Sequence, residues 1–147
     1  MSPALRFDGK VVVITGAGGG LGRAYALAYA KLGAKVVVND LGGSTRGEGA
    51  SNSAADKVVD EIKAGGGEAI ANYDSVTQGD KIIAAAVQRY GRVDILINNA
   101  GILRDVSFAK MKDQDWELMN NVHLNGTYKT TKVSGFSSHQ YSVVARS

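Results

Sequence analysis

A glycine-rich segment near the N-terminus has the residue types and the spacing that suit binding of a diphosphate. It runs from Thr15 to Gly22 and reads TGAGGGLG. It lies between a β-branched run and a run with helical spacing, so it forms a strand-to-helix turn. We expect Gly16 to permit a tight turn, Gly20 to let the backbone approach the ligand, and Gly22 to let the helix pack closely. The helix N-terminus, which includes Leu21, then offers free N–H groups to an anion.

This turn has two other interpretations. A P-loop requires Gly-Lys-Ser or Gly-Lys-Thr at its end, whereas this chain has leucine, glycine and arginine at positions 21–23, so a P-loop is rejected. An ordinary glycine turn without a ligand stays open, because a glycine-rich turn alone is weak evidence. The strand before it and the helix after it favour the nucleotide-binding interpretation.

Asp40 closes the second β-branched run, 24 residues (40 − 16) after Gly16. A carboxylate near this offset accepts hydrogen bonds from the two hydroxyls of the adenosine ribose and repels a 2′-phosphate. We therefore expect NAD rather than NADP as the cofactor. Two alternatives remain: Arg46 in the following loop would meet a 2′-phosphate if the loop folds back, and Asp40 would be a solvated charge if no nucleotide binds.

The surrounding sequence alternates strands with helices. We expect strands at 10–15, 35–40, 68–72 and 93–98, and helices at 21–32, at 51–64 with Ser51 or Ser53 as the cap, at 78–90, and after a cap at Asp113. Such alternation predicts right-handed crossovers and a parallel sheet covered by helices. The expected fold is the N-terminal part of a Rossmann-like, doubly wound α/β sheet with strand order 3-2-1-4.

The composition excludes several classes of function. The chain has 147 residues, a net charge of +3, no cysteine and two histidines. A disulfide framework is excluded, and a structural zinc site is not expected. The basic residues are scattered, so nucleic acid is not an expected partner. No secretory leader and no apolar run long enough to span a membrane are apparent.

A second motif, Asn98-Asn99-Ala100-Gly101, closes the fourth strand. Together with the glycine turn it resembles the short-chain dehydrogenase/reductase family. The resemblance implies that the glycine turn binds the dinucleotide, and that Asn99, Ala100 and Gly101 brace the sheet and line the cofactor groove.

Three residues after the third strand match the region of this family that contacts the adenine ring. Asp74 and Val76 occupy matching positions, and Ser75 lies between them. The alternative is that Asp74 and Ser75 form an ordinary polar turn.

The resemblance narrows to the dehydrogenase domains of peroxisomal multifunctional β-oxidation enzymes. It runs from Phe7 to Lys132 and rests on segments 38–43, 71–76, 98–105 and 122–127. It implies NAD-dependent oxidation of a (3R)-3-hydroxyacyl-CoA to the 3-ketoacyl-CoA, a homodimer, and a peroxisomal location. The last three residues, Ala-Arg-Ser, are not a Ser-Lys-Leu address, so a cytoplasmic location is the alternative.

The family's catalytic serine and Tyr-x-x-x-Lys pair are expected after the point where this chain ends. Residues 1–132 are therefore predicted to form an incomplete NAD-binding domain, and residues 133–147 a disordered or unrelated tail. Tyr128 and Lys132 have the spacing of the catalytic pair, but their helix follows the fourth strand directly, so we reject them. We expect an inactive truncated dehydrogenase; the alternatives are a dinucleotide-binding fragment without chemistry and a mis-spliced product.

The helix after Asp113 carries two further features. Trp116, Met119 and Val122 form an apolar stripe, which is typical of packing and, by resemblance, of a subunit interface. His123 occupies a position where many family members have an asparagine that helps to relay protons. It is a candidate proton relay, and the alternative is a half-buried packing histidine. Asn125 lies two residues on and faces elsewhere.

Overall fold

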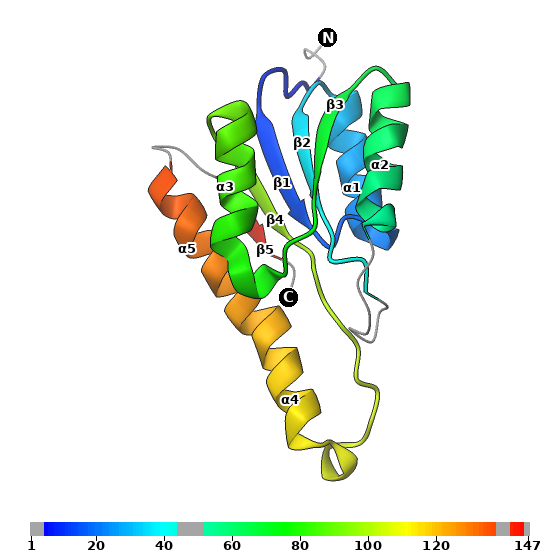
Figure 1. The fold of residues 1–147 in the computed structure, drawn as a ribbon, viewed down its shortest axis with the longest axis vertical. Coiled ribbons are helices and arrows are strands. Elements are labelled where there is room, and N and C mark those ends of the chain that lie inside the picture. The colour runs from blue at the N-terminus through cyan, green and yellow to red at the C-terminus, as the bar shows by residue number, and fades with distance from the viewer. Residues whose placement is uncertain (1–4, 44–51, 138–141, 146–147) are drawn as a thin grey trace.

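The computed structural model describes residues 5–43, 52–137 and 142–145 (Figure 1). Strands and helices alternate along most of the chain, as the sequence predicts. The elements are β1 (Val11–Thr15), α1 (Gly20–Lys31), β2 (Lys35–Asn39), α2 (Ser53–Ala64), β3 (Glu68–Asn72), α3 (Gly79–Tyr90), β4 (Ile95–Asn98), α4 (Asp113–Met119), α5 (Thr127–Ser137) and β5 (Ser142–Ala145).

The strands form one parallel sheet with the order β3-β2-β1-β4-β5. The predicted order 3-2-1-4 and the Rossmann-like α/β class are confirmed. Because parallel strands share a direction, the turns after β1, β2, β3 and β4 all meet at one edge of the sheet. This edge brings together the glycine turn, Asp40 and the Asn-Asn-Ala-Gly motif.

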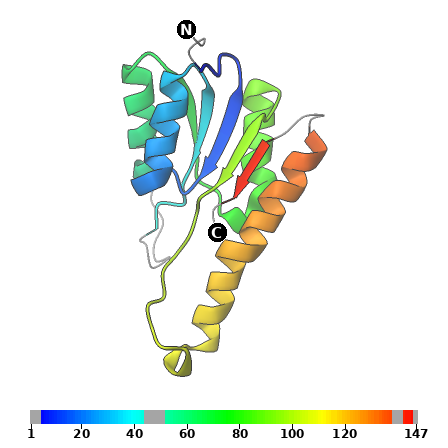
Figure 2. The same cartoon turned by 180° about the vertical axis from the view of Figure 1, so that it is seen from behind.

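Alternate side chains of β1 enter two different cores, which explains its unbroken β-branched sequence. Val12 and Ile14 are fully buried against the face covered by α1 and α2. Val11 and Val13 are buried in the core that α3 covers on the opposite face. Figures 1 and 2 show α1 and α2 on one side of the sheet, with α3 and α5 on the other.

The lateral side of the sheet next to β4 differs from the prediction. The sequence predicts that β4 lies at an open edge and that residues 133–147 form a tail without regular structure. Instead, α5 continues to Ser137, and β5 pairs in parallel with β4 in a register that joins Ile95 to Ser142. A parallel neighbour requires a crossover connection, which the helical segment between β4 and β5 provides. Four residues are too few to show a strand period in the sequence.

Two predicted helix caps were wrong. Asp113 is the first residue of α4, and its N-cap is Lys112, which has an extended backbone. Asp113 lies instead in the first turn, where its negative charge complements the helix dipole. The N-cap of α2 is Asn52. Ser53 begins that helix, and Ser51 lies outside the described residues.

The long helical segment after β4 is not a regular α-helix. Between α4 and α5 the chain forms a π-helix over Asn120–Gly126. The hydroxyl of Thr127 donates to the His123 carbonyl at 2.7 Å, and that of Thr130 donates to the Gly126 carbonyl at 2.9 Å. Figures 1 and 2 show that α5 lies beside the sheet whereas α4 projects beyond it.

A buried carboxylate determines where β4 begins. The strand was expected from residue 93 but starts at Ile95. Just before it, Asp94 accepts the Val11 N–H at 2.9 Å, although its side chain is only 8% exposed. Arg92 forms an ion pair with the same carboxylate, and Lys10 Nζ lies 3.5 Å from it. At the amino end of the sheet, the Asp94 carboxylate thus accepts a hydrogen bond that a main-chain carbonyl would otherwise accept.

Replacing Asp94 tests this interpretation. In Asp94→Ala the buried Val11 N–H loses its partner, so we expect the free energy of unfolding to fall by about 1–3 kcal/mol. Asp8→Ala is the matched control, because Asp8 also pairs with an arginine two residues earlier but is exposed. Urea denaturation at neutral pH measures both variants. An equal loss in the two would contradict the proposed role of the buried carboxylate.

The stability difference between the unaltered chain and Asp94→Ala should depend on pH. Burial acts to raise the pKa of Asp94, but the Val11 N–H and the charges of Arg92 and Lys10 outweigh it and hold the pKa below its usual range. The carboxylate therefore stabilises the fold above the unfolded pKa of about 3.9, and this stabilisation is lost as the pH falls through the lower, folded pKa. Acidification should shrink the stability difference between the unaltered chain and Asp94→Ala.

Candidate functional site

The glycine turn follows β1 and has the conformation that its glycines suggested. Gly16 and Gly20 have positive φ angles of 64° and 50°. A Cβ on Gly16 would lie 2.8 Å from the Cα of Ala100, so this position has no room for a side chain. A Cβ on Gly20 would meet nothing within 4 Å. The turn is therefore packed at its start and open where it enters α1.

Gly22 is the tightest position of the turn. A Cβ there would lie 2.2 Å from the Gly16 carbonyl oxygen and 2.6 Å from Nδ2 of Asn99. The sequence predicted close packing of the helix on the strand. In the structure, Gly22 is required for a different reason: the space that its side chain would fill is occupied by the carbonyl of the turn and the amide of the loop after β4.

The N-terminus of α1 has no internal partner for its first N–H groups. Gly19 is the N-cap, no side chain caps the helix, and the first turn contains no acidic residue. The first i to i−4 bond runs from the Arg23 N–H to the Gly19 carbonyl at 3.0 Å. The preceding N–H groups, including that of the exposed Leu21, have no carbonyl ahead of them within the helix. This end of α1 therefore suits an anion.

Asp40 lies directly beside the turn. Its Oδ2 accepts the Gly18 N–H at 2.8 Å, and its Oδ1 accepts the Gly42 N–H at 2.7 Å. A Cβ on Gly18 would lie 2.8 Å from the carboxylate, so this glycine, which the sequence analysis missed, is required for the contact. Each carboxylate oxygen has a second lone pair for a further donor. Asp40 thus holds the turn and still has acceptor capacity. Arg46, the alternative phosphate partner, lies outside the described residues.

The loop after β4 braces the turn through Thr15. The hydroxyl of this buried residue accepts the N–H groups of Asn99 and Ala100, both at 3.1 Å. In return, Asn99 Nδ2 donates to the carbonyls of Thr15 and Gly16 at 3.1 and 3.0 Å. Asn98 faces the other way and binds the hydroxyls of Thr130 and Thr131. The motif therefore joins the ends of β1 and β4 and anchors α5.

The three residues after β3 have separate environments. Asp74 is half-buried and accepts a hydrogen bond from Asn72 Nδ2 at 2.8 Å. Ser75 caps a 3₁₀ turn over Val76–Gln78, accepting the Thr77 N–H at 3.3 Å. Val76 is 9% exposed, and a Cβ on Gly126 would lie 2.6 Å from its side chain. Asp74 and Ser75 therefore form a polar turn at the same edge as Asp40, with Val76 packed beneath it.

His123 holds the loop after the Asn-Asn-Ala-Gly motif. Its Nε2 lies 2.9 Å from the Ile102 carbonyl oxygen and 3.1 Å from the Ile102 nitrogen. A Cβ on Gly101 would lie 2.8 Å from the imidazole ring, so Gly101 makes room for it. His123 is exposed rather than half-buried, although its imidazole packs against Gly101 and the Ile102 backbone. Asn125 binds Asn121 instead, at 2.9 Å.

Tyr128 and Lys132 lie on the outer surface of α5. Lys132 Nζ donates to the Tyr128 hydroxyl at 3.0 Å, and this bond raises the pKa of Lys132. Tyr128 is 57% exposed, whereas Thr130, which binds the sheet through Asn98, is fully buried. The pair therefore lies at the surface of α5, on a different face of the helix from the buried Thr130.

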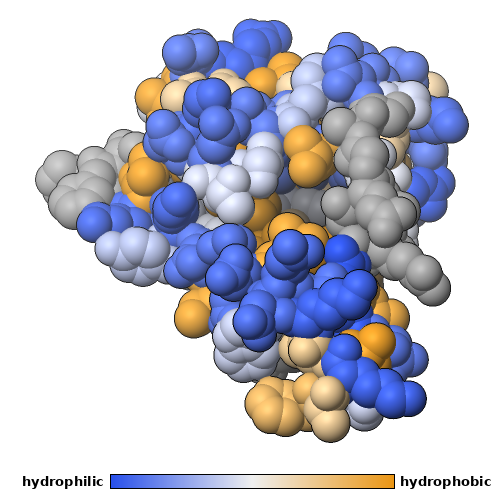
Figure 3. All heavy atoms as spheres, turned by 60° about the horizontal axis from the view of Figure 1, so that its bottom comes forward, coloured by the Kyte–Doolittle hydropathy of each residue, from blue (hydrophilic) through white to orange (hydrophobic). Residues whose placement is uncertain are grey.

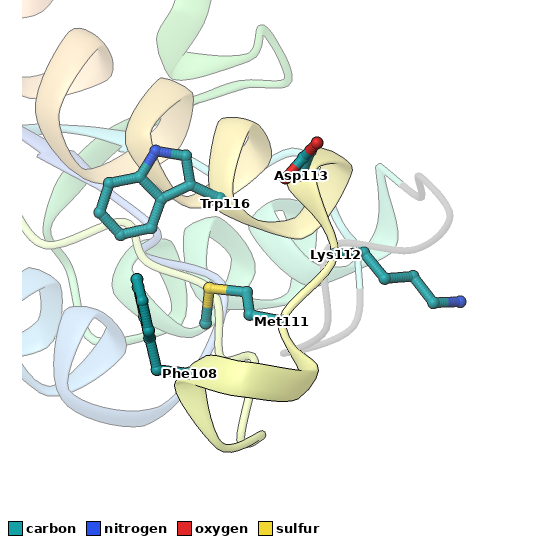
Figure 4. Close-up of a pocket in the computed structure, with 5 residues that line it drawn as sticks. All are labelled: Phe108, Met111, Lys112, Asp113 and Trp116. Carbon is teal, nitrogen blue, oxygen red and sulfur yellow. The ribbon is translucent and has the colours of Figure 1, made fainter.

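The projecting end of the molecule exposes a group of apolar side chains. Phe108, Met111 and Trp116 line a hollow together with Lys112 and Asp113 (Figure 4). Phe108 is 85% exposed and Trp116 is 54% exposed. Figure 3 shows apolar side chains at this lower tip of the molecule. We call the exposed surface of Phe108, Met111 and Trp116 the apolar tip.

The fold and the turn are those of the doubly wound α/β class that binds dinucleotides. The family described as short chain dehydrogenase matches residues 10–135, so the chain belongs to this family. The match ends close to the boundary expected at Lys132. The division of the chain at that residue stays a prediction.

Three comparisons illustrate the relationship. The chain is 64% identical over 134 residues to a peroxisomal hydratase-dehydrogenase-epimerase of Neurospora crassa, covering 91% of this chain and 15% of that protein. The solved full-length peroxisomal multifunctional enzyme type 2 of Drosophila melanogaster is 50% identical, with a TM-score of 0.70, over 89% of this chain and 20% of that one. Carveol dehydrogenase of Mycobacterium avium in complex with NAD is 25% identical, with a TM-score of 0.85, over 95% and 55%. The chain thus spans a minor part of its multifunctional relatives.

Among the described residues, no helix is both long and apolar enough to cross a membrane.

A serine at two positions of the turn tests its packing. Gly22→Ser should lower the free energy of unfolding by about 1–3 kcal/mol, because the new side chain overlaps the Gly16 carbonyl and the Asn99 amide. Gly19→Ser is the control, since this N-cap is extended with open space around its Cβ, and serine is a favoured cap. Thermal unfolding measures both. A Gly22→Ser chain as stable as Gly19→Ser would show that the turn can open without cost.

Proposed function

We propose that this chain is the NAD-binding part of a dehydrogenase that oxidises (3R)-3-hydroxyacyl-CoA to 3-ketoacyl-CoA in peroxisomal fatty-acid oxidation. The observation that carries the proposal is the uncapped N-terminus of α1, which lies beside a glycine turn that Asp40 and Asn99 hold in place. The names of the relatives support the pathway and the location. The cofactor, when bound, accepts the hydride removed from the alcohol carbon.

Each part of the edge has a role in this proposal. The N–H groups at the start of α1, from Gly20 to Gly22, bind the diphosphate. Asp40 accepts the hydroxyls of the adenosine ribose while it keeps its bonds to Gly18 and Gly42. Asp74, Ser75 and Val76 form the place for the adenine ring. Asn99, Ala100 and Gly101 line the groove toward the nicotinamide.

The charge of Asp40 is the basis for preferring NAD to NADP. Both of its oxygens already accept backbone N–H groups, which fixes the carboxylate at the end of β2. A 2′-phosphate on the ribose would bring a second negative charge to this fixed carboxylate, whereas a 2′-hydroxyl donates to it.

His123 is kept as a candidate proton relay. Its imidazole is exposed and lies against the Ile102 backbone, in the loop that follows the Asn-Asn-Ala-Gly motif. We also propose a homodimer in which the apolar tip packs against a second copy. Exposed aromatic side chains gathered at one place support this interface.

The NAD proposal predicts the effect of removing one charge. The unaltered chain should bind NAD more tightly than NADP, and Asp40→Asn, which keeps the shape of the side chain, should reduce this preference about tenfold or more. Asp60→Asn, an exposed change on α2, is the control. Titration calorimetry with both dinucleotides measures the ratio. A ratio that stays the same in Asp40→Asn would contradict the ribose role.

A turnover assay tests the division between binding and chemistry. The 147-residue chain carries the spacing of the family's catalytic pair only in Tyr128 and Lys132, which lie at the exposed surface of α5. We therefore expect this polypeptide to bind NAD but to form no NADH from a (3R)-3-hydroxyacyl-CoA. Steady NADH formation, measured by absorbance, would show that other side chains of this chain supply the acid–base chemistry.

A further inference from the structure

One imidazole nitrogen lies within hydrogen-bond distance of both polar backbone groups of Ile102. His123 Nε2 is 3.1 Å from the Ile102 nitrogen and 2.9 Å from the Ile102 carbonyl oxygen. A ring nitrogen that carries a proton donates, and one without a proton accepts. Nε2 therefore binds either the N–H or the carbonyl, and never both at once. The structure thus places a titratable group between two alternative partners on one residue.

The imidazole is held in this place from two sides. Gly101 has no side chain, and a Cβ there would lie 2.8 Å from the Cε1 atom of the ring. On the other side, the His123 carbonyl accepts the Thr127 hydroxyl at 2.7 Å within the π-helix. Because both the ring and its own backbone are held, a change of partner at Nε2 acts on the loop that contains Ile102.

In the neutral imidazole, we expect the proton to be on Nδ1. Nε2 then accepts the Ile102 N–H, and the carbonyl oxygen of this partly exposed residue is free to bind water. The opposite tautomer would leave the N–H without this acceptor, and proteins tolerate an unpaired N–H less well than an under-used carbonyl. Since His123 is exposed, water accepts the Nδ1 proton.

The charged groups around the imidazole are bound elsewhere or exposed. Helices α4 and α5 and the 3₁₀ turn after β3 pack against the π-helix, and that turn has no charged residue. Arg104 of the loop pairs with Asp115 of α4 at 2.7 Å, and Lys129 of α5 donates to the Thr77 carbonyl at 3.0 Å. The other charged residues of the loop and these helices are exposed: Asp105, Lys110, Lys112, Asp113, Glu117 and Lys132. Among the described residues, no carboxylate forms an ion pair with His123.

We propose that His123 is a pH-sensitive latch on the loop that follows the Asn-Asn-Ala-Gly motif. The neutral imidazole accepts the Ile102 N–H. When a proton from water binds to Nε2, the imidazolium releases the N–H and donates to the Ile102 carbonyl instead. Imidazoles take up this proton between about pH 8 and about pH 5. The change occurs directly after Gly101, beside the proposed cofactor groove, but the inference itself does not depend on NAD binding.

Two NMR measurements on the full chain test the latch. The ¹⁵N spectrum of the imidazole at about pH 8 shows which ring nitrogen carries the proton, and we expect Nδ1. Hydrogen exchange of the Ile102 amide, divided by the rate of an unstructured peptide at the same pH, reports the bond to Nε2. We expect its protection to be about threefold to tenfold lower at about pH 5 than at about pH 8, because the N–H loses its acceptor.

His123→Asn separates the change of partner from other effects of pH. A carboxamide carries both an acceptor and a donor, so it binds the N–H and the carbonyl at either pH. The protection of the Ile102 amide should then be the same at both pH values. His139→Asn is the matched control, because it replaces the other histidine of the sequence, which lies outside the described residues. This control should keep the fall in protection.

The outcomes do not depend on the proposed function. A neutral imidazole with its proton on Nε2 overturns the inference without any variant. Protection of the Ile102 amide that stays constant in acid, or that falls equally in His123→Asn, overturns it as well. A chain that shows the latch but does not bind NAD overturns the proposed function and supports this inference.

Discussion

The candidate site depends on the absence of a side chain at Gly22. At Gly22 the space that a Cβ would fill is occupied by the carbonyl of Gly16 and the amide of Asn99, and that amide also bonds to the end of β1. The loop after β4 therefore shapes the turn after β1. Since the same loop is held by the Thr15 hydroxyl, two strands distant in sequence together fix the backbone at the start of α1.

The features that the sequence predicted are local or follow from simple topology. The glycines of the turn are adjacent in the chain, so their need for positive φ or close approach appears in a single short segment. The carboxylate at 40 was predicted from its offset along one β-α-β unit. The order 3-2-1-4 followed from the alternation of elements and the handedness of crossovers, because neither requires knowledge of side-chain packing.

The features that the sequence did not predict depend mainly on how residues of different strands align. The bond between Asn39 and Asn72 exists because β2 and β3 align these residues, and each asparagine alone resembles an ordinary strand end. The sequence predicts a strand that includes Asp94, because the partner of its side chain, the Val11 N–H, lies far away in the chain. The cap expected at Asp113 was displaced by one residue, and a four-residue strand at 142–145 was too short to show a pattern.

The π-helix between α4 and α5 puts the two ends of one long helix out of phase. Residues 116 and 130 are about four α-helical turns apart, so an uninterrupted α-helix would place them near the same face. A π-helix uses more residues in each turn, which rotates everything that follows it. Thr130 can then be wholly enclosed while Trp116 is largely in water. If residues 120–126 formed a regular α-helix with the same number of residues, the indole would swing around the axis toward the side that now carries the enclosed threonine.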